Sequence, residues 1–473
     1  MSRAKTLMVW GTSSGAGKSL TTTALCRILS NKGYKVAPFK AQNMSNNARV
    51  ALGGEIGCAQ YFQALAARCE PCVDHNPVLL KPEKATRSQV VLLGEANREL
   101  TEMDWRRRSP LLWEASKPSL EKLLSENDIV VAEGAGSPAE INLSDCDYVN
   151  LSTARMMGGA AWLVSDIDRG GAIASCFGTW GLLSEQDRAL LKGFVFNRFR
   201  GDVKLLEPAP TMLFERTGVP VVGVVPRFAH SLPDEDAATW SEQPRRIGNK
   251  VIAICAYPQV SNFDEFQPLA RLTGWDLQLA RSARELEGAD LILLPGSKHS
   301  PTDLAWLRDR GMDAAILSHA AAGKPVVGIC GGLQMLGGAL HDPHGVEGEA
   351  TGLGLLPIET VYGSRKRVVK NRQILSNLPS QWACWEGLEA QGYEIRMGNS
   401  RYPSSSDDAA LSFAQGCVFG TYLHGLFESR EICEALFGSG SWGMPDLEDT
   451  FETLAATVEA GLAPGALEKS LGI

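Results

Sequence analysis

A glycine-rich loop near the start of the chain restricts its fold more than any other stretch does. Residues 6–10 are apolar and predict a short buried strand, and an amphipathic helix is expected over about residues 20–32. Between them lies the sequence Gly-Thr-Ser-Ser-Gly-Ala-Gly-Lys-Ser, residues 11–19. Backbone N–H groups of such a loop, together with the N-terminus of the following helix, bind phosphate oxygens. The stretch therefore predicts an α/β domain with a phosphate-binding loop.

The loop also supplies candidate nucleotide contacts. Lys18 can neutralise the charge of the β- and γ-phosphates, and the Ser19 hydroxyl can ligate Mg²⁺. The other loop residues expected to contact ATP are Thr12, Gly15, Ala16 and Gly17. Five residues rather than four separate Gly11 from Gly17, so the strict Walker pattern is missed by one. In this spacing the loop is similar to the dethiobiotin synthetase-like branch of P-loop proteins, whose members transfer phosphate to carboxylates. The alternative is a glycine-rich turn that binds nothing.

Polar side chains stand at the ends of several further apolar runs. Because the carboxyl ends of parallel strands face the ligand crevice in open α/β sheets, we expect these side chains to gather near the phosphate. They are Lys40, Gln42, Asn43, Glu133, Asp166, Asp168 and Asn197.

Each of these polar residues has an expected role and a simpler alternative. Glu133 is expected to face a Mg²⁺ ion opposite Ser19, and Asn197 to hydrogen-bond an adenine edge. The lysine, the amide residues at 42 and 43 and the two aspartates are expected to contact the substrate or the transferred phosphoryl group. Alternatively, the lysine is solvated and either aspartate caps a helix.

The alternation of apolar strands with helical segments predicts a mostly parallel sheet covered on both faces. Residues 1–230 are expected to form this synthetase domain, and the polar, aperiodic residues 231–250 a linker. A second α/β domain is expected over residues 251–435, and residues 436–473 read as a helical appendage. A length of 473 residues agrees with two or three domains.

In the second half, Cys330 follows the apolar run at residues 325–329 and precedes Gly331 and helix-like sequence. A tight strand-to-helix turn of this kind exposes a nucleophile. The start of the helix favours thiolate, and glycine N–H groups can approach a developing oxyanion. The alternative is a buried free cysteine.

Two further stretches change the balance between those alternatives. His424 lies in the sequence Gly-Thr-Tyr-Leu-His, and Gly296 lies in a glycine turn upstream of the cysteine. A cysteine, a distant histidine and a second glycine turn in this chain order resemble the class I glutamine amidotransferases. The resemblance implies that Cys330 cleaves glutamine, that Gly296 and Gly331 form the oxyanion hole, and that ammonia passes to a partner reaction.

Composition excludes several other classes of protein. A formal net charge of −8 with both signs interspersed argues against nucleic-acid or membrane-surface binding. Eleven scattered cysteines, with no secretory signal and no apolar run long enough to span a bilayer, favour a reducing cytoplasm.

Over nearly its whole length the chain resembles the cobyric acid synthase family, glutamine-dependent amidotransferases that act on corrinoids. The family implies ATP, Mg²⁺ and glutamine, and an adenosylated corrin a,c-diamide whose b, d, e and g carboxylates are amidated. The motifs that carry the resemblance lie at residues 11–19, 39–44, 76–82, 88–91, 133–142, 166–171, 196–202, 294–298 and 420–424.

Two departures concern the glutaminase half. Arg396 stands where the family usually has a histidine, in Gly-Tyr-Glu-Ile-Arg, and we expect it to line the glutamine pocket. Leu426 stands where common glutaminases place a glutamate two residues after the histidine, a position that the cobyric acid synthase branch also lacks. His424 is therefore expected to depend on backbone groups to hold its tautomer.

Three other functions fit parts of the sequence. Cobyrinic acid a,c-diamide synthase has the same two-domain plan, and a lipid-linked cell-wall amidotransferase fits less well. From a different class, the first half could be a nucleotide-dependent switch of the partition-ATPase kind joined to a binding module. Such a switch has no use for Cys330 together with His424, and this pair therefore discriminates between the two classes.

Overall fold

A computed structural model of the protein describes residues 3–84, 87–233, 249–403 and 410–473. The chain forms two compact units, and each unit contains more than one segment of the chain. Unit 1 comprises Met1–Ser45, Ala51–Leu232 and Pro445–Ile473, and unit 2 comprises Asn46–Val50 and Pro233–Met444. Most of the expected linker, residues 234–248, lies outside the described residues.

Unit 1 is built on a six-stranded parallel sheet with the order β12-β11-β10-β1-β9-β2. The predicted α/β fold with a parallel sheet is confirmed. The strands are β1 Lys5–Gly11, β2 Val36–Phe39, β9 Ile129–Glu133, β10 Ala160–Asp166, β11 Leu191–Phe199 and β12 Val221–Pro226.

Helices cover both faces of this sheet because successive side chains of each strand point to opposite faces. In β1, Leu7 and Val9 belong to one apolar core, and Met8 and Trp10 to the other. Helices α1 Lys18–Asn31, α14 Leu447–Gly461 and α15 Ala466–Leu471 contribute to the first core. The second core contains residues of α4 Trp105–Glu126, α5 Thr153–Met157, α6 Ala172–Leu182 and α8 Ala209–Thr217.

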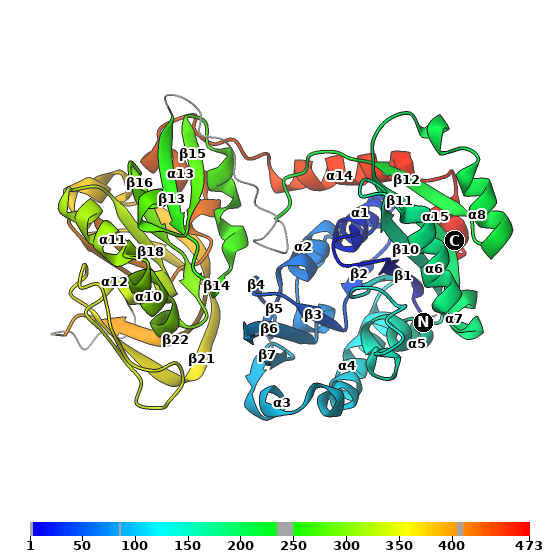
Figure 1. Ribbon diagram of the computed structural model, residues 1–473, viewed down its shortest axis with the longest axis horizontal. Helices are drawn as coiled ribbons and strands as arrows, with labels where there is room; N and C mark the ends of the chain where they lie inside the picture. The colour runs from blue at the N-terminus through cyan, green and yellow to red at the C-terminus, as the bar shows by residue number, and fades with distance from the viewer. Residues whose placement is uncertain (1–2, 85–86, 234–248, 404–409) are drawn as a thin grey trace. The chain divides into compact units, whose positions relative to one another are not determined.

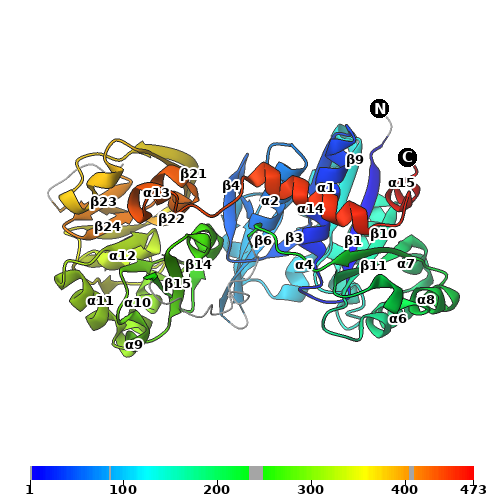
Figure 2. The same cartoon turned by 90° about the horizontal axis from the view of Figure 1, so that it is seen from above.

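Helices α14 and α15, in the stretch expected to be an appendage, are part of the core of unit 1. Figures 1 and 2 show α14 lying along α1, and Phe451 of α14 is fully buried there. The Trp162 indole in β10 donates a hydrogen bond of 2.9 Å to the hydroxyl of Ser470 in α15. These helices therefore complete one face of the nucleotide-binding sheet.

The remaining elements of unit 1 surround this sheet. A four-stranded sheet has the order β3-β6-β7-β8, with β3 Gln42–Met44, β6 Val78–Lys84, β7 Arg87–Leu92 and β8 Glu95–Asn97. The other helices are α2 Cys58–Ala66, α3 Arg98–Glu102 and α7 Glu185–Leu190, and β5 Gly54–Gly57 is a short strand. Strand β4 Ala48–Ala51 belongs to unit 2 except for its last residue.

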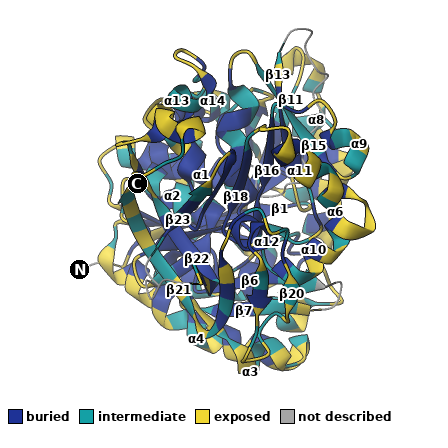
Figure 3. Cartoon of the chain, turned by 90° about the vertical axis from the view of Figure 1, so that its left-hand side faces the viewer, coloured by how far each residue is buried: buried dark blue, intermediate teal, exposed yellow. Residues whose placement is uncertain are grey.

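Unit 2 is built on a second six-stranded sheet, with the order β15-β13-β16-β18-β24-β23. All pairs are parallel except that of β23 with β24. The strands are β13 Lys250–Cys255, β15 Trp275–Ala280, β16 Leu291–Leu294, β18 Val326–Ile329, β23 Ser412–Gln415 and β24 Val418–Thr421. Strands β16 and β18 are buried along their whole length (Figure 3). The turn that follows β18 is therefore anchored in the core of unit 2.

Helices and a smaller sheet complete unit 2. The helices are α9 Ala283–Leu286, α10 Ser300–Asp309, α11 Met312–Ala321, α12 Gly331–Leu336 and α13 Arg430–Phe437, with the 3₁₀ segments η6 Phe263–Arg271 and η8 Leu426–Glu428. A four-stranded sheet has the order β20-β19-β21-β22, with β19 Ala339–His341, β20 Ala350–Thr351, β21 Glu359–Ile374 and β22 Glu389–Arg401. Strands β14 Val260–Ser261 and β17 Gly296–Ser297 form an antiparallel pair.

Within the described ranges, no helix combines the length and the apolar character that crossing a membrane requires.

Candidate active sites

The phosphate-binding loop connects β1 to α1 in unit 1. Gly15 and Gly17 have positive φ angles of 72° and 102°, a region that residues with a side chain rarely adopt. A Cβ atom at position 17 would lie 1.9 Å from the side-chain nitrogen of Asn197, which itself donates to the carbonyl of Ala16 at 3.0 Å. Asn197 of β11 therefore lies against the loop, and its expected contact with adenine stays a prediction. The amide of Thr12 donates to the carbonyl of Val164 in β10 at 2.9 Å.

Lys18 begins α1 and is almost fully buried. Its amine donates to the carbonyls of Ser13 and Gly136 at 2.9 and 3.1 Å. The amine is thus held over the loop by two backbone oxygens, a position from which it can reach an anion bound there.

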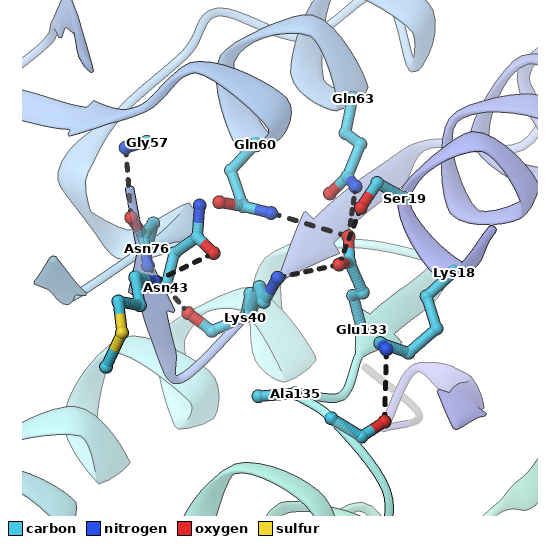
Figure 4. A network of polar contacts seen from close by, with 12 residues as sticks. Lys18, Ser19, Lys40, Asn43, Gly57, Gln60, Gln63, Asn76, Glu133 and Ala135 are labelled. Atoms are coloured by element: carbon cyan, nitrogen blue, oxygen red, sulfur yellow. Dashed lines mark hydrogen bonds and ion pairs between the residues drawn. The ribbon is translucent and has the colours of Figure 1, made fainter. Parts of the chain in front are cut away.

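Glu133, at the end of β9, is the centre of the polar network in Figure 4. One carboxylate oxygen accepts from Ser19 at 2.9 Å and from Lys40 at 2.7 Å, and the other accepts from Gln63 at 2.5 Å. Burial raises the pKa of Glu133, but Lys40 and Gln63 together lower it by more, so that the pKa lies below its ordinary value. Glu133 is therefore an anion at neutral pH.

The donor set at this point fits Mg²⁺. The Ser19 hydroxyl and the Glu133 carboxylate are both hard oxygen ligands, they are 2.9 Å apart, and they stand beside the phosphate loop. Mg²⁺ is usually held by one or two such ligands together with phosphate oxygens and water. Lys40 forms an ion pair with Glu133, so a cation held at this point would share the carboxylate with Lys40.

The other polar residues predicted near Lys40 have local partners. The Tyr148 hydroxyl donates to the side-chain oxygen of Gln42 at 2.6 Å, which places this oxygen beside the segment that follows β9. Asn43 is buried, and its side-chain oxygen accepts from the amide of Met44 at 3.0 Å. Lys40 contacts the residues around the loop through its ion pair with Glu133.

Asp166 and Asp168, after β10, are both paired with arginines. Asp166 accepts from Arg198 at 2.8 Å and also caps the turn through the amide of Asp168 at 2.9 Å. Asp168 contacts Arg200 and, at 2.9 Å, Arg227, and the hydrogen bond from Arg200 lowers its pKa. The contact of Asp166 with the amide of Asp168 lies in a turn and is not the helix cap considered as the alternative, because Gly171 is the N-cap of the next helix, α6, and no side chain caps it. The arginines were missed as site candidates, although two of them lie in the motif at residues 196–202.

In unit 2, Cys330 stands between β18 and α12 in the predicted strand-to-helix turn. Its φ and ψ angles are 50° and −103°, an unusual backbone conformation for a residue with a side chain. Its amide donates to the carbonyl of Thr421 at 2.7 Å, and its thiol lies 3.7 Å from the carbonyl of Ile395. The strained turn is thus fixed to β24 on one side and directs the sulfur toward β22 on the other.

His424 lies just beyond β24, and its imidazole is hydrogen-bonded to the Cys330 side chain. The expectation that backbone groups hold its tautomer is wrong in one respect. The Nδ1 atom lies 2.7 Å from a carboxylate oxygen of Glu265 in η6, and the other oxygen accepts from the amide of Gly425 at 2.7 Å. Cys330, His424 and Glu265 therefore form a buried nucleophile–base–carboxylate chain.

Glu265 had no recognisable signal in the sequence. It lies far upstream of the histidine, in the stretch Phe-Asp-Glu-Phe-Gln-Pro, rather than two residues after it. The only hint was a pair of acidic residues flanked by aromatic ones at the start of the second domain. The tertiary fold brings it to His424 because η6 and η8 pack together.

The groups around His424 strongly shift the pKa of its imidazole. Burial lowers the pKa of His424, but the Glu265 carboxylate and the Cys330 sulfur raise it by more, to about 10. His424 is therefore protonated at neutral pH, and its imidazolium lies beside the Cys330 sulfur.

Of the two predicted oxyanion glycines, Gly296 packs against His424, and Gly331 packs against Ser297 and Ser300. A Cβ atom at Gly296 would lie 2.9 Å from His424 Cε1, and one at Gly331 would lie 2.6 Å from the amide nitrogen of Ser297. Only glycine fits at either position without displacement of its neighbours. Gly331 is the first residue of α12, so its N–H lies in the turn where helical amides have no intrahelical acceptor.

Arg396 in β22 is buried and has several partners. Its guanidinium donates to Glu394 and to the carbonyl of Gly398, both at 2.6 Å, contacts Asn399, and lies 4.0 Å from the centre of the Tyr422 ring. It follows Ile395, whose carbonyl faces the cysteine. Its expected role in glutamine binding stays a prediction.

Comparisons with known proteins match both halves of the chain. Residues 7–236 match the family model described as the CobQ/CobB/MinD/ParA nucleotide binding domain, and residues 251–432 match the CobB/CobQ-like glutamine amidotransferase domain. The cobyric acid synthase of Methylibium petroleiphilum is 52% identical over 498 residues, which cover 99% of this chain and 97% of that protein. That of Paracidovorax citrulli is 53% identical over 483 residues, covering 98% of each chain, and that of Polaromonas sp. is 50% identical over 500 residues, also covering 98% of each. The chain belongs to the cobyric acid synthase family and is a ligase that carries out amidation in cobalamin biosynthesis.

Proposed function

We propose that the protein converts the b, d, e and g carboxylates of adenosylcobyrinic acid a,c-diamide into amides, with glutamine as the nitrogen source and ATP as the activating reagent. The observation that carries the proposal is the presence, in one chain, of the Cys330–His424–Glu265 chain and of the Lys18–Ser19–Glu133 site. An amide ligase of this type needs both chemistries, because a carboxylate must be activated and ammonia must be supplied.

At the glutaminase site, the Cys330 thiolate attacks the side-chain amide of glutamine and forms a thioester. His424 gives a proton to the departing ammonia and then takes one from the water that releases glutamate. Glu265 holds the imidazole by Nδ1 and stabilises its charged form, while backbone N–H groups near Gly296 and Gly331 stabilise the oxyanion.

At the nucleotide site, a substrate carboxylate attacks the γ-phosphoryl group of ATP and releases ADP. Ammonia then attacks the acyl phosphate, which yields the amide and phosphate. Lys18 neutralises charge on the transferring group, and Lys40 orients and balances Glu133. Mg²⁺, which Ser19 and Glu133 would hold, supplies further charge neutralisation on the phosphates.

Two variants separate the two chemistries. Cys330→Ala should abolish glutamine hydrolysis, because a methyl group cannot form the thioester, yet retain amidation with ammonium salt at alkaline pH. Lys18→Ala should fail with either nitrogen source, because ammonia cannot replace charge stabilisation of the phosphoryl group. If Cys330→Ala stays folded but loses ammonia-driven amidation, or if Lys18→Ala keeps it, the assignment of the two sites is wrong.

Mass spectrometry of the product tests the choice of substrate. Each carboxylate converted to an amide lowers the product mass by about one unit, so the a,c-diamide should lose about four in total. A change on cobyrinic acid itself, with none on the a,c-diamide, would transfer the proposal to the a,c-diamide synthase reaction.

We also propose that the enzyme works in the reducing cytoplasm. All eleven cysteines are free thiols, among them the nucleophile. A chain whose activity depends on a thiolate is suited to a compartment that keeps thiols reduced.

A further inference from the structure

The segment Asn46–Val50 lies in the sequence of the nucleotide-binding half but belongs to unit 2. We propose that this segment is a positioning element of the glutaminase site, and that Arg49 is the residue through which it acts on the His424–Glu265 pair. The inference rests on the proposed glutaminase role of Cys330 and His424 and adds a requirement to it.

The backbone evidence concerns the start of η6, the segment that carries Glu265. The amide of Asn262 donates to the carbonyl of Asn46 at 3.3 Å, and the amide of Phe263 donates to the side-chain oxygen of Asn47 at 3.0 Å. In return, the amide of Ala48 donates to the side-chain oxygen of Asn262 at 2.9 Å. Amides at the start of a helical segment have no intrahelical acceptors, so the segment supplies acceptors that η6 lacks.

The conformation of Asn262 makes this support important. Its φ angle of 53° lies in the left-handed region, which costs energy for a residue other than glycine. Residues in such conformations persist when their surroundings fix them. Residues 46–48 form three hydrogen bonds with Asn262 and Phe263. This segment therefore fixes the backbone from which η6 begins.

Arg49 adds a buried electrostatic contact to the same segment. Its guanidinium contacts the carboxylate of Asp264 and lies 2.6 Å from that of Glu428. The side chains of Arg49 and Asp264 are 4% and 0% exposed. Removal of one partner from a buried ion pair is strongly destabilising, because the other charge remains without compensation.

Each group that Arg49 contacts is close to His424 or to the residues that hold its imidazole. Asp264 precedes Glu265 on η6, and Glu428 ends η8, just after the Gly425 amide that Glu265 binds. The guanidinium also lies 5.2 Å from the centre of the Tyr393 ring, and this ring stacks on His424 at 5.3 Å with an interplanar angle of 18°. Arg49 thus contacts both of the elements that hold Glu265 and the ring that lies against the imidazole.

Loss of the guanidinium should therefore misplace the carboxylate and the imidazole rather than remove either. Asp264 would remain as a buried anion directly beside Glu265, with one cation fewer nearby. The structure at η6 would then shift, and Glu265 would orient His424 less well. A small misplacement of catalytic groups lowers the rate of the chemical step more than it weakens substrate binding.

The experiment uses full-length protein and measures glutamine hydrolysis and ammonia-driven amidation separately. Arg49→Ala should lower the glutaminase kcat by about 100-fold, with the glutamine KM changed by less than about 3-fold, and should leave ammonia-driven amidation at the wild-type rate. The glutaminase kcat of Arg49→Lys should lie between those of the wild type and Arg49→Ala, because lysine keeps the charge but not the planar guanidinium. The matched control is Arg372→Ala, which removes an exposed arginine of the same unit, 3.6 Å from Glu389, and should change neither activity.

A double variant distinguishes positioning from loss of fold. In Arg49→Ala with Asp264→Asn, the uncompensated buried charge is gone, so kcat should recover by about 10-fold relative to Arg49→Ala alone. If Arg49→Ala does not fold, Arg49→Lys and the double variant are judged by the same split of kcat from KM. Wild-type kcat in the folded variants would overturn the inference.

Failure of the proposed function would look different. If wild-type protein hydrolyses no glutamine, or if Cys330→Ala retains hydrolysis, the proposed glutaminase site is wrong. If Cys330→Ala abolishes hydrolysis while the Arg49 variants match the wild type, only the positioning role is wrong.

Discussion

At the residue scale, Glu265 combines two tasks in one carboxylate. One oxygen orients and charges the imidazole of His424, and the other fixes the backbone amide of Gly425. A change of charge without a change of shape therefore affects the ring more than the backbone, since an amide oxygen can still accept from Gly425. This distinction makes Glu265 the most informative single position in unit 2.

Glu265→Gln should lower the glutaminase kcat by about 10³–10⁴-fold, because an amide cannot stabilise the imidazolium. Ammonia-driven amidation should be retained, since the nucleotide site lies in unit 1. Steady-state kinetics with each nitrogen source measure this. A fall of less than about 3-fold in kcat would show that backbone groups suffice to hold His424, as the sequence first suggested.

The raised pKa of His424 predicts a pH dependence of stability. A histidine titrates near pH 6.5 when unfolded, and His424 titrates at about 10 when folded. Its protonation therefore stabilises the fold fully below pH 6.5, and this contribution is lost as the pH rises through 10. The difference in unfolding free energy between the wild type and His424→Ala should narrow between pH 6 and pH 10 in urea titrations. A constant difference would mean that the ring is neutral when folded.

Arg396→Ala should raise the glutamine KM by about 10-fold with little effect on ammonia use, if the guanidinium binds the carboxylate of glutamine. The matched control is Arg367→Ala. Arg367 also pairs with Glu394, at 3.0 Å, but is half exposed on β21. An unchanged KM in Arg396→Ala, or an equal rise in both variants, would assign the arginine to support of Glu394 instead.

At the scale of elements, features set by local sequence could be predicted, whereas contacts set by the tertiary fold could not. The strands at residues 6–10, 160–166 and 251–256 could be predicted from apolar runs, and the turns at Gly17 and Cys330 from glycine spacing, because these signals are contiguous in sequence. The third member of the glutaminase chain could not, since Glu265 reaches His424 only through the packing of η6. The partners of α14 could not either, because an amphipathic face does not identify the sheet that it covers.

Phe451→Ala tests whether α14 is a structural part of unit 1. Phe451 is fully buried against α1, and the Arg27 guanidinium lies 5.0 Å from the centre of its ring. The variant should lose about 3–5 kcal/mol of unfolding free energy, as for a large aromatic residue removed from a core. Leu447→Ala, at the partly exposed start of the same helix, should lose about 0.5 kcal/mol or less. Equal, small losses in denaturant titrations would contradict the packing role.

At the scale of the whole molecule, the chain passes between the two units four times. It leaves unit 1 after Ser45, returns at Ala51, leaves again after Leu232 and returns at Pro445. Each unit therefore contains a piece of chain from the other side of the expected linker. This connectivity predicts how the molecule responds to a cut.

A specific protease site placed between residues 233 and 249 should give two fragments that elute together under native conditions. The larger α/β part of unit 1 keeps α14 packed on α1, although this helix belongs to the other fragment. Size-exclusion chromatography with and without denaturant measures the effect, and the fragments should separate only with denaturant. Separate elution of the two fragments in native buffer would contradict the assignment of α14 and of Asn46–Val50.

The same connectivity dictates an order of completion during protein synthesis. Residues 46–50 are synthesised long before η6, with which they pack. The sheet of unit 1 is likewise synthesised before α14, which covers one of its faces. At about 5–20 residues per second, the interval between Leu232 and Pro445 is roughly 10–40 s. During that time the apolar core that includes Trp162 and Val195 lacks the residues that α14 and α15 contribute to it. A nascent chain of this enzyme is therefore most vulnerable late in translation, when most of it has already been made.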